Sequence, residues 1–420
     1  MASTLFGLLP PGRPGIFVIM AMGFPTNVVV ALAGEAERGQ LRTHAPVAEL
    51  NPDGAWPRIQ EEPELQPPEE PRMSPTTARA FGWVEQGLVP DRVVRLGIRR
   101  LLKERLAEMR VDDAEAAEEA NQAFIEEMRL APIALLVEKA NEQHYEVPAE
   151  FFAGVLGPHR KYSSCHWGPG VETLEQAETE SLRVTCERAG LRDGQDVLEL
   201  GCGWGSLSLW MADHYRASHI TAVSNSQSQR RYIERQAEAR GLLNLRVITR
   251  DVNEFDAEPG RYDRVVSVEM FEHLRNWPHI FARVAGWLKD DGRFFMHVFA
   301  HRGAPYAFVE RDETDWMSRH FFSGGMMPGD DLAPNFQDDL RLQRRWRWDG
   351  THDQKTSEAW LRNMDAARAE LMPMMAATYG AAADVWWQRW RLFFMSVAEL
   401  FGHDGGQQWW VSHYLFSKRA

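Results

Sequence analysis

Apolar and polar positions alternate in a regular order through the second half of the chain. Short apolar runs predict five strands: residues 197–200, 220–224, 245–250, 264–268 and 293–301. The segments between most of these runs repeat their apolar residues at helical spacing, as residues 226–240 and 278–289 do. Repetition of strand and helix builds a parallel sheet that is covered by helices on both faces.

The end of the chain adds two more strands, which are separated by helices. Residues 340–348 alternate apolar and polar side chains, and residues 409–417 form another apolar run. Between them, residues 357–377 and 384–400 have the spacing of amphipathic helices. The pattern therefore predicts an α/β fold with helical insertions between the late strands.

The first 80 residues differ from the rest in composition. Residues 40–78 are rich in Pro and Glu with few large apolar side chains, so they cannot bury enough surface to offset the entropy of ordering. Residues 16–33 are mostly apolar, but Gly, Pro and Asn interrupt them, which argues against a spanning helix. We predict a disordered or low-complexity extension over residues 1–80. A targeting segment within residues 1–34 is the alternative.

Helical patterns begin at about residue 81. Residues 88–105 carry apolar residues at helical spacing with six Arg and Lys residues between them, which predicts a basic amphipathic helix. This helix either packs on the main domain, which we favour, or lies on an anionic surface. Helical spacing continues through residues 114–139. We therefore predict a helical extension over residues 81–160, followed by the main domain over residues 161–420.

Composition narrows the function classes. The chain of 420 residues has 47 Lys and Arg against 60 Asp and Glu, a formal net charge of −13. This balance argues against general nucleic-acid binding, because a duplex binder needs a basic face. Cys165, Cys186 and Cys202 are too few for a disulfide framework and lack the spacing of a metal site. They fit a reducing compartment, so we expect a cytoplasmic protein without a bound metal.

A glycine-rich turn follows the first predicted strand. Residues 197–205 read Val-Leu-Glu-Leu-Gly-Cys-Gly-Trp-Gly, so the carboxylate of Glu199 precedes Gly201, Gly203 and Gly205. These glycines let the backbone approach a ligand at the carboxyl end of the strand. The spacing differs from the G-x-G-x-x-G of dinucleotide-binding loops. A tight strand-to-helix turn without a ligand is the alternative interpretation.

Polar residues also follow the next two strands. Ser224 and Asn225 end the second strand, with Gln229 close behind, and all three can exchange hydrogen bonds with ribose hydroxyls or a carboxylate. After the third strand, Asp251 could accept from an adenine amine, and Val252 could pack on the ring. With the carboxylate before the glycine turn, these residues lie at three successive strand ends beside one crevice. The set fits S-adenosylmethionine, whose sulfonium favours aromatic and acidic neighbours.

Longer motifs occur in a fixed order along the chain. They lie at residues 143–148, 161–165, 199–206, 268–273, 315–317, 321–328 and 398–402. Together they resemble the cyclopropane-fatty-acid-synthase-like methyltransferases, and especially the coclaurine N-methyltransferase branch, over roughly residues 85–420. The resemblance implies a seven-stranded class I, Rossmann-like methyltransferase fold with a helical N-terminal extension and helical cap insertions. It makes residues 161–420 the methyltransferase domain.

The resemblance also assigns residues to the cofactor. It implies that Tyr162 and Ser163 contact S-adenosylmethionine. It gives the same role to several residues that the strand pattern had already singled out: Gly201, Gly203, Asn225, Gln229, Asp251 and Val252.

An acidic cluster follows the fourth strand. Glu269, Glu272 and His273 would share a face if a helix began there. Carboxylates beside a sulfonium favour a cationic amine substrate, and an imidazole has the intrinsic pKa to accept a proton near neutrality. This segment is catalytic and amine-binding in the coclaurine branch, so the resemblance implies that these three residues are catalytic. A solvated cluster that caps a helix is the alternative.

A bicarbonate ion acts as the base in cyclopropane synthases, and the side chains that hold it match Cys165, Glu272 and His297. Two departures argue against this chemistry here. The His-Thr-Ile-Gly of those synthases reads His-Val-Phe-Ala from residue 297, and a family tyrosine aligns with Asp353, which we expect to repel bicarbonate. Cys165 and His297 remain candidates for the substrate pocket, and we expect Cys165 to be a packed thiol rather than a nucleophile.

Aromatic residues are frequent in the segments predicted to cap the site. Trp316, Phe321 and Phe322 lie there, and aromatic faces could hold both a sulfonium and a flat substrate. Most aromatic side chains of such a region nevertheless belong to the core.

The sequence therefore predicts an S-adenosylmethionine-dependent methyltransferase that acts on the nitrogen of a small amine, aromatic or not. The main alternative is methylation or cyclopropanation of an unsaturated acyl chain at a membrane, as in cyclopropane-fatty-acyl-phospholipid synthases. A methyltransferase fold that serves as an inactive binding module is the least favoured interpretation. The expected partner is a small molecule, with no nucleic acid, and membrane contact is not favoured.

Overall fold

The structure of the protein, a computed structural model, describes residues 75–109, 114–135, 147–309 and 316–419. Residues 1–74 of the predicted extension, with the alternative targeting segment in residues 1–34, lie outside the described residues. Residues 143–146 and 315 of the family-like motifs also lie outside them. No helix in the described part of the chain is long and apolar enough to cross a membrane.

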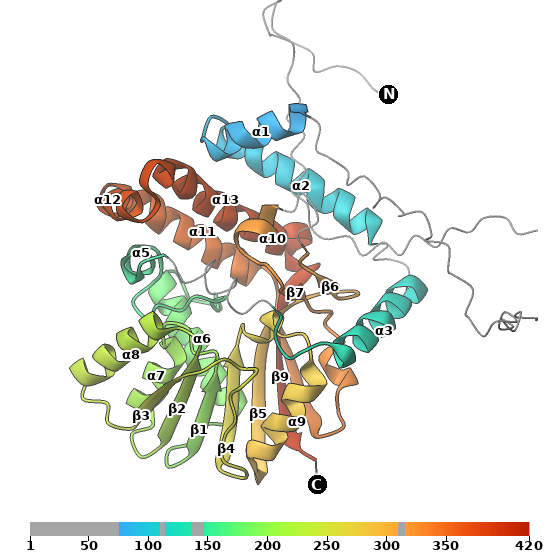
Figure 1. Cartoon of the computed structure of the whole chain (residues 1–420), viewed down its shortest axis with the longest axis vertical. Helices are drawn as coiled ribbons and strands as arrows, with labels where there is room; N and C mark the ends of the chain where they lie inside the picture. Colours follow the sequence, from blue (N-terminus) through green and yellow to red (C-terminus); the bar gives the residue numbers. More distant parts are fainter. Residues whose placement is uncertain (1–74, 110–113, 136–146, 310–315, 420) are drawn as a thin grey trace, which may run out of the picture. The chain divides into compact units, whose positions relative to one another are not determined.

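A sheet of seven strands is the main element of the fold (Figure 1). The strands are β1 (Asp196–Leu200), β2 (His219–Ser224), β3 (Leu245–Thr249), β4 (Tyr262–Val268), β5 (Leu288–His301), β8 (Leu340–Trp348) and β9 (Trp409–Lys418). Their order is β3-β2-β1-β4-β5-β9-β8, with β1 to β5 parallel and β9 antiparallel to both of its neighbours. All seven predicted strands are thus confirmed. The crossovers reverse direction between β1 and β4, where a crevice for a ligand is expected.

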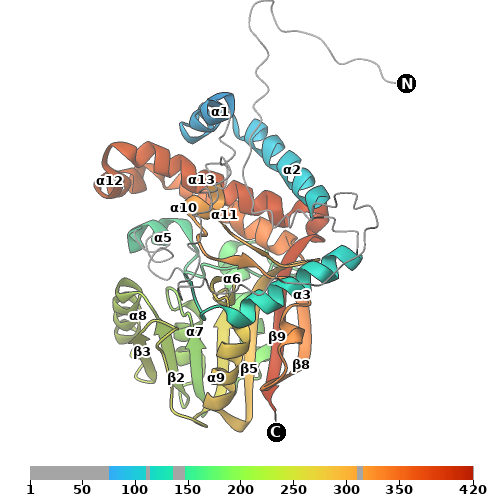
Figure 2. The ribbon, with the colours of Figure 1, turned by 45° about the vertical axis from the view of Figure 1, so that its right-hand side comes forward.

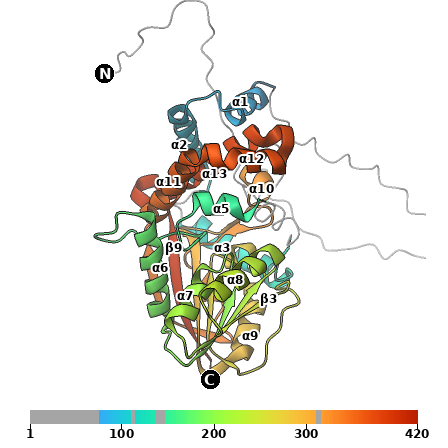
Figure 3. The same ribbon diagram turned by 90° about the vertical axis from the view of Figure 1, so that its left-hand side faces the viewer.

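Successive strand residues point to opposite faces of the sheet, so both faces carry apolar side chains, and helices cover both. Val197 and Phe295 belong to one core cluster with three helices, and Leu198 and Phe294 belong to the opposite cluster with two others. The first group is α6 (Leu174–Ala189), α7 (Ser206–His214) and α8 (Gln227–Ala239), and the second is α9 (Trp277–Trp287) and α3 (Ala114–Leu130). Figure 3 shows α6 and α9 on opposite sides of the sheet.

A further set of helices lies over the carboxyl ends of the parallel strands (Figures 1 and 2). These helices are α1 (Pro75–Glu85), α2 (Asp91–Glu108), α5 (Ala149–Val155), α10 (Trp316–His320), α11 (Thr351–Ala366), α12 (Arg368–Tyr379) and α13 (Ala383–Phe401). The prediction of one helix over residues 357–377 was wrong, because the backbone changes direction at Ala367 and separates α11 from α12. Helix α1 begins within the segment predicted as an extension.

Several short elements complete the fold. They are β6 (Tyr306–Ala307) and β7 (Met326–Met327), which pair with each other, and the 3₁₀ turns η1 (Phe271–His273), η2 (Ala333–Asn335), η3 (Gly380–Ala382) and η4 (His403–Gly406). These elements are too short for a hydrophobic period to predict them. After the fourth strand, where a helix would have put the acidic residues on one face, the chain forms a single 3₁₀ turn.

The basic helix α2 packs on the main domain. Its Val94, Ile98 and Leu102 are almost completely buried, in contact with α13. Arg95 Nη1 lies 2.9 Å from an oxygen of Glu399, on α13, and 2.6 Å from an oxygen of Glu358, on α11. The structure thus supports the first of the two interpretations of this helix, since part of its positive charge is paired within the protein.

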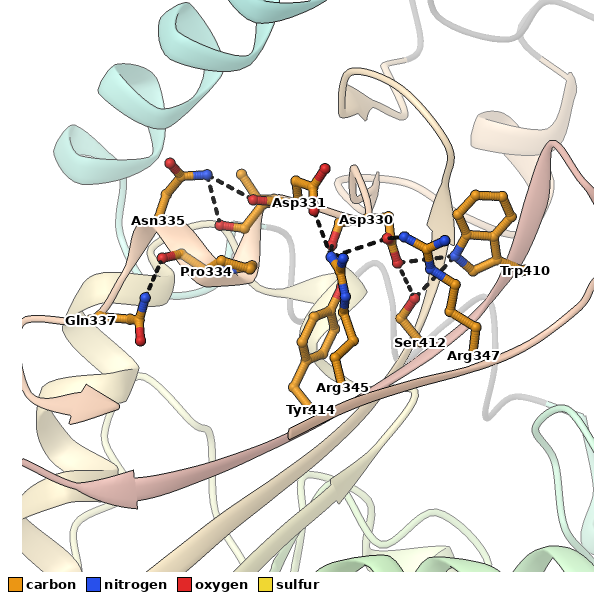
Figure 4. A network of polar contacts seen from close by, with 11 residues as sticks. Asp330, Asp331, Pro334, Asn335, Gln337, Arg345, Arg347, Trp410, Ser412 and Tyr414 are labelled. Atoms are coloured by element: carbon orange, nitrogen blue, oxygen red, sulfur yellow. Dashed lines mark hydrogen bonds and ion pairs between the residues drawn. The ribbon is translucent and has the colours of Figure 1, made fainter. Parts of the chain in front are cut away.

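One buried carboxylate fastens the segment after β7 to the last two strands (Figure 4). Asp330 is 1% exposed and accepts hydrogen bonds from Trp410 Nε1 at 3.0 Å and from Ser412 Oγ. It also forms ion pairs with Arg345, at 3.1 Å, and with Arg347. Removal of this carboxylate would take the ion pair from Arg347 and one of two ion pairs from Arg345, and would leave the buried Trp410 N–H without this acceptor.

Asp330→Ala is expected to lower the free energy of unfolding by about 3 kcal/mol, because the buried Trp410 and Ser412 lose their acceptor and the two arginines lose an ion-pair partner. Asp331→Ala is the matched control. Asp331 also pairs with Arg345, but its side chain is 77% exposed, so we expect a loss of less than about 1 kcal/mol. Urea denaturation measures both values, and equal losses would contradict the anchoring role of Asp330.

Candidate active site

The glycine turn after β1 has a backbone that requires glycine. Gly201, Gly203 and Gly205 all have positive φ angles, of 73°, 51° and 77°. A Cβ at Gly201 would lie 2.6 Å from Cγ of Met270, and one at Gly205 would lie 2.5 Å from Cγ1 of Ile233. A Cβ at Gly203 would meet nothing within 4 Å. The first and third glycines therefore permit close packing, whereas the second faces open space.

That open space belongs to two cavities that meet at the glycine turn. The larger has a volume of about 190 Å³ and the smaller about 100 Å³. Four residues line both of them: Gly201, Gly203, Gln229 and His273. A ligand with two unlike ends could therefore extend from one cavity into the other past the glycine backbone.

The smaller cavity has the features expected for a nucleoside. Ser224 and Asn225 line it at the end of β2, and Ser224 Oγ donates to Gln229 Oε1 at 2.7 Å. This bond orients the Gln229 amide, whose nitrogen remains able to donate to a ligand. Val252 and Phe255 supply apolar wall. Hydroxyl and amide groups beside an apolar wall suit a ribose and a flat base.

Asp251 differs from the other predicted cofactor residues. Its Oδ1 accepts from the N–H of Asn253 at 2.8 Å, within the turn after β3. Asp251 is not among the described residues that line either cavity. The structure therefore gives Oδ1 of Asp251 a role in the turn, between Arg250 and Val252, which both line the smaller cavity. Its contact with an adenine amine stays a prediction.

The larger cavity has a polar end next to the glycine turn. Tyr162, Ser163, Glu199 and Ser206 line it. Burial raises the pKa of Glu199 to about 8, against the opposing hydrogen bond from Ser208. Ser206 Oγ, in the first turn of α7, is buried without a hydrogen-bond partner among the described residues. A polar ligand group would satisfy it, so the two joined cavities fit the amino-acid and adenosine ends of S-adenosylmethionine.

Six aromatic side chains, together with Leu, Met and Val residues, line the part of the larger cavity away from the glycine turn. The aromatic residues are Phe299, Phe308, Phe322, Trp360, Phe393 and Phe401. Of the three aromatic residues predicted for the substrate, Phe322 is in this wall. Trp316 and Phe321 are not among the lining residues. Trp316 Nε1 donates to Glu85 at 2.8 Å, and Phe321 stacks on Phe393, so both support the wall from outside.

Glu269 follows β4 and projects its carboxylate to the larger cavity. Its φ of +45° lies in the left-handed region, which residues other than glycine rarely adopt. Its N–H donates to the carbonyl of His297 at 2.9 Å. Its Oε1 accepts from the N–H of Ser164 at 2.9 Å and lies 3.1 Å from Nε2 of His297. Since both contacts are to Oε1, Oε2 is left for a ligand.

The two carboxyl groups after β4 have opposite pKa shifts. Burial raises the pKa of Glu269, but the hydrogen bond with His297 and the charge of Lys161 outweigh it, so the pKa lies below its ordinary range. Burial, and then the charge of Glu269, raises the pKa of Glu272 well above its ordinary range. These shifts favour an anion at Glu269 and a neutral acid at Glu272.

Of the three predicted catalytic residues, the structure brings Glu269 and His273 to the cavity. Glu272 is completely buried and is not among the lining residues, and its Oε1 accepts from the N–H of Phe299 at 2.8 Å. His273 stacks on Phe322 with 4.8 Å between ring centroids. Burial lowers the pKa of His273 to about 4, so it does not keep the near-neutral pKa on which the sequence argument relied.

Sequence reasoning missed a buried lysine at the site. Lys161 is 3% exposed, lines the larger cavity and donates from Nζ to Ser163 Oγ at 2.6 Å and to the carbonyl of Ser164. Lys161 therefore holds the loop in which the N–H of Ser164 donates to Oε1 of Glu269. The only signal was its position at the start of the motif over residues 161–165, where a lysine alone indicates no particular chemistry.

Asp353 also lines the larger cavity and is 6% exposed. Burial and the charge of Glu269 raise its pKa well above the ordinary range, although Lys161 opposes this shift. The raised pKa favours the neutral acid. A neutral Asp353 would repel bicarbonate less than the carboxylate assumed from the sequence.

Cys165 and His297 lie behind the cavity wall. Both are completely buried, and neither is among the lining residues. The Cys165 N–H donates to Thr356 Oγ1 at 3.0 Å, and burial raises the pKa of its thiol, as expected for a packed cysteine. His297 instead reaches the cavity through its contact with Glu269.

Comparison with known proteins identifies relatives along most of the chain. The family model for mycolic acid cyclopropane synthetase matches residues 137–407. The (S)-coclaurine N-methyltransferase of Thalictrum flavum subsp. glaucum is 35% identical over 343 residues, which cover 80% of this chain and 94% of the relative. The cyclopropane-fatty-acyl-phospholipid synthase of Escherichia coli (strain K12) is 28% identical and covers 55% of this chain and 57% of its own length.

Solved structures agree with the fold. A coclaurine N-methyltransferase bound to N-methylheliamine and S-adenosylhomocysteine is 34% identical, covers 81% of this chain and 99% of its own, and superposes with a TM-score of 0.78. The cyclopropane synthase MmaA2 of Mycobacterium tuberculosis is 22% identical, covers 69% of this chain and 100% of its own, and has a TM-score of 0.58. The predicted class I methyltransferase fold is confirmed.

Gly203→Ala is expected to weaken S-adenosylhomocysteine binding at least roughly tenfold, because the added methyl group would occupy the space where the two cavities meet. Isothermal titration calorimetry measures the affinity. Gly194→Ala is the matched control, since Gly194 also has a positive φ, of 83°, and open space at its Cβ, but lines neither cavity. An equal loss of affinity in both variants would assign the effect to backbone strain.

Proposed function

This chain belongs to the mycolic acid cyclopropane synthetase family and is an S-adenosylmethionine-dependent methyltransferase, and we propose that its acceptor is the nitrogen of a small aromatic amine. The observation that carries the proposal is the carboxylate of Glu269 at an aromatic cavity beside the glycine turn. An anion among aromatic faces suits a cation with a flat apolar body. The inactive binding module considered from the sequence is not retained.

Glu269 binds the amine through the oxygen that the protein leaves available. Its Oε1 is occupied by Ser164 and by His297, so Oε2 accepts from the substrate ammonium. Because the carboxylate is fixed at one oxygen, the position of the nitrogen relative to the cavity is also fixed. Such positioning is the main contribution that a protein can make to an in-line methyl transfer.

The acceptor nitrogen must lose a proton before its lone pair can attack. S-adenosylmethionine, when bound, supplies a methyl group on a positively charged sulfur. His273 lines both cavities, and its pKa of about 4 keeps the imidazole neutral near pH 7 but makes it a weak base, so it holds the proton only in passing while the proton moves to water. The aromatic wall excludes bulk water from the reacting groups.

Several features favour an amine over an unsaturated acyl chain. The N-methyltransferase relative is similar along 80% of this chain, against 55% for the phospholipid synthase. Cys165 and His297, which match bicarbonate-holding side chains, lie outside the cavity wall. Arg95 of the basic helix is engaged by Glu358 and Glu399, which reduces the charge available for a lipid surface.

A label-transfer screen separates the two acceptor classes. The full chain is incubated with methyl-labelled S-adenosylmethionine and either a panel of aromatic primary and secondary amines or vesicles of unsaturated phospholipid. We expect label in the amines. Label confined to the lipid fraction would overturn the proposal.

Glu269→Gln is expected to lower kcat/KM for an amine substrate roughly a hundredfold, because the ammonium loses a charged acceptor. Glu272→Gln, three residues along the chain, is the matched control. The raised pKa of Glu272 favours the neutral acid, and its carboxyl lies outside the cavity wall, so the amide should change kcat/KM less than about fivefold. Both variants should bind S-adenosylhomocysteine like the wild type, and a larger loss in Glu272→Gln would contradict the assignment.

A further inference from the structure

A continuous row of side chains joins Glu269 to Arg188 on α6, by way of one residue on β5 and one on β9. His297 on β5 and His413 on β9 are register partners, with ring centroids 4.6 Å apart. His413 Nε2 lies 2.9 Å from His297 Nδ1, and His297 Nε2 lies 3.1 Å from Glu269 Oε1. At the far end, Nη1 of Arg188 lies 2.7 Å from His413 Nδ1. All three separations are hydrogen-bond distances.

The chemistry of arginine decides the direction of every bond in this row. A guanidinium can only donate, so Nδ1 of His413 must accept and its proton must be on Nε2. That proton is donated to Nδ1 of His297, which places the proton of His297 on Nε2. His297 therefore donates to Glu269. The donor property of Arg188 is transmitted through two imidazoles to the carboxylate.

The surroundings keep both imidazoles neutral and in place. His297 and His413 are completely buried, and Trp348 packs against them, with ring centroids 5.5 Å and 4.4 Å away. Burial lowers the pKa of His297 to about 4 and that of His413 well below its ordinary value. Arg188 is half-buried over Trp346 and Trp348. A neutral histidine has two tautomers, so something must choose between them.

The choice of tautomer matters at Glu269. With the proton on Nε2, His297 and the N–H of Ser164 both donate to Oε1, which leaves Oε2 for the substrate. With the proton on Nδ1, a lone pair of His297 would face the carboxylate, and the two groups would repel each other. Glu269 would then have to rotate or take up a proton.

We propose that Arg188 and His413 are positioning residues that lock His297 as a donor to Glu269, and thereby hold Glu269 as an oriented carboxylate toward the substrate. The proposal rests on the proposed function insofar as Glu269 binds the amine. Neither residue touches the cavity: they act through His297, which acts through Glu269.

Other titratable groups also face this row. The charge of Lys161 lowers the pKa of Glu269, and the charge of Glu269 in turn raises the pKa values of Glu272, Asp353 and His273. The pKa of His413 is lowered by Arg188, Lys161 and His166. The variants below leave all of these groups in place except Arg188, so a change in behaviour can be assigned to the row.

The first test compares variants that keep or remove the donor. Arg188→Met removes the donor and retains much of the length, and Arg188→Lys keeps a donor. His413→Leu removes the link, whereas His413→Gln can accept from Arg188 through its oxygen and donate to His297 through its nitrogen. We expect kcat/KM for the amine to fall roughly tenfold or more in Arg188→Met and His413→Leu, and to stay within about threefold in the other two.

The pH profile of kcat/KM adds a readout that a purely structural role would not change. Without the donor from His297, the Glu269 carboxylate is less stabilised, so its pKa rises and the acidic limb of the profile moves to higher pH. We expect this shift in Arg188→Met and His413→Leu, and its absence in Arg188→Lys and His413→Gln. An unchanged acidic limb in all four variants would overturn the proposal.

The tautomers can be observed without any substrate. The full chain is labelled with ¹⁵N-histidine, and His297 and His413 are assigned by comparison with His297→Gln and His413→Gln. Long-range ¹H–¹⁵N correlation distinguishes protonated from unprotonated ring nitrogens. We expect both histidines to carry the proton on Nε2 in the wild type, and His413 to lose that preference in Arg188→Met. Wild-type histidines protonated on Nδ1 would also overturn the proposal.

The two readouts separate the failure of this proposal from the failure of the proposed function. If the wild type methylates no amine but its histidines have the expected tautomers, the amine function fails and the lock stands. If the wild type methylates amines but Arg188→Met changes neither activity nor tautomer, the lock fails. Should His413→Leu not fold, the comparison of Arg188→Met with Arg188→Lys decides, with S-adenosylhomocysteine binding as the check on folding.

Discussion

The active site depends on one largely buried carboxylate, that of Glu269, whose lowered pKa favours the anion. Glu269 is fixed by its own left-handed backbone, by the N–H of Ser164 and by His297. His297, on the neighbouring strand β5, contacts Glu269 twice: its carbonyl accepts from the Glu269 N–H, and its ring contacts the Glu269 carboxylate. The sheet therefore positions the carboxylate, and the helices above the strands need only enclose it.

Electrostatic balance explains why this carboxylate can stay ionised. A buried anion is costly unless it is paired or hydrogen-bonded. Lys161 supplies a nearby buried cation, and the raised pKa values of Glu272 and Asp353 favour neutral acids beside it. The site thus contains several carboxyl groups but concentrates its negative charge at Glu269. A positively charged substrate is favoured at that one point rather than across the whole wall.

Local features of the sequence were sufficient to predict the sheet, the glycine turn and the segment over residues 268–273, because each is encoded by adjacent residues. Contacts between distant residues were not predictable in the same way. His413 is 116 residues from His297 and is an ordinary member of an apolar strand until β9 pairs with β5. Asp251 had the expected position after β3, but its side chain bonds within its own turn. The break at Ala367 has no Gly or Pro to mark it.

The sheet and the helices over its strand ends build different ends of the site. Strand ends and the glycine turn build the cofactor end, and these are the parts with the clearest local patterns. The acceptor end is built by segments far apart in the chain, such as Phe322 after α10, Trp360 on α11 and Phe393 on α13. Of the acceptor side, the sheet contributes Glu269, which follows β4, and Phe299 on β5. The geometry of the strand ends and the glycine turn therefore identifies the methyl donor, while the aromatic residues of the wall and the charge of Glu269 are the features that bear on the acceptor.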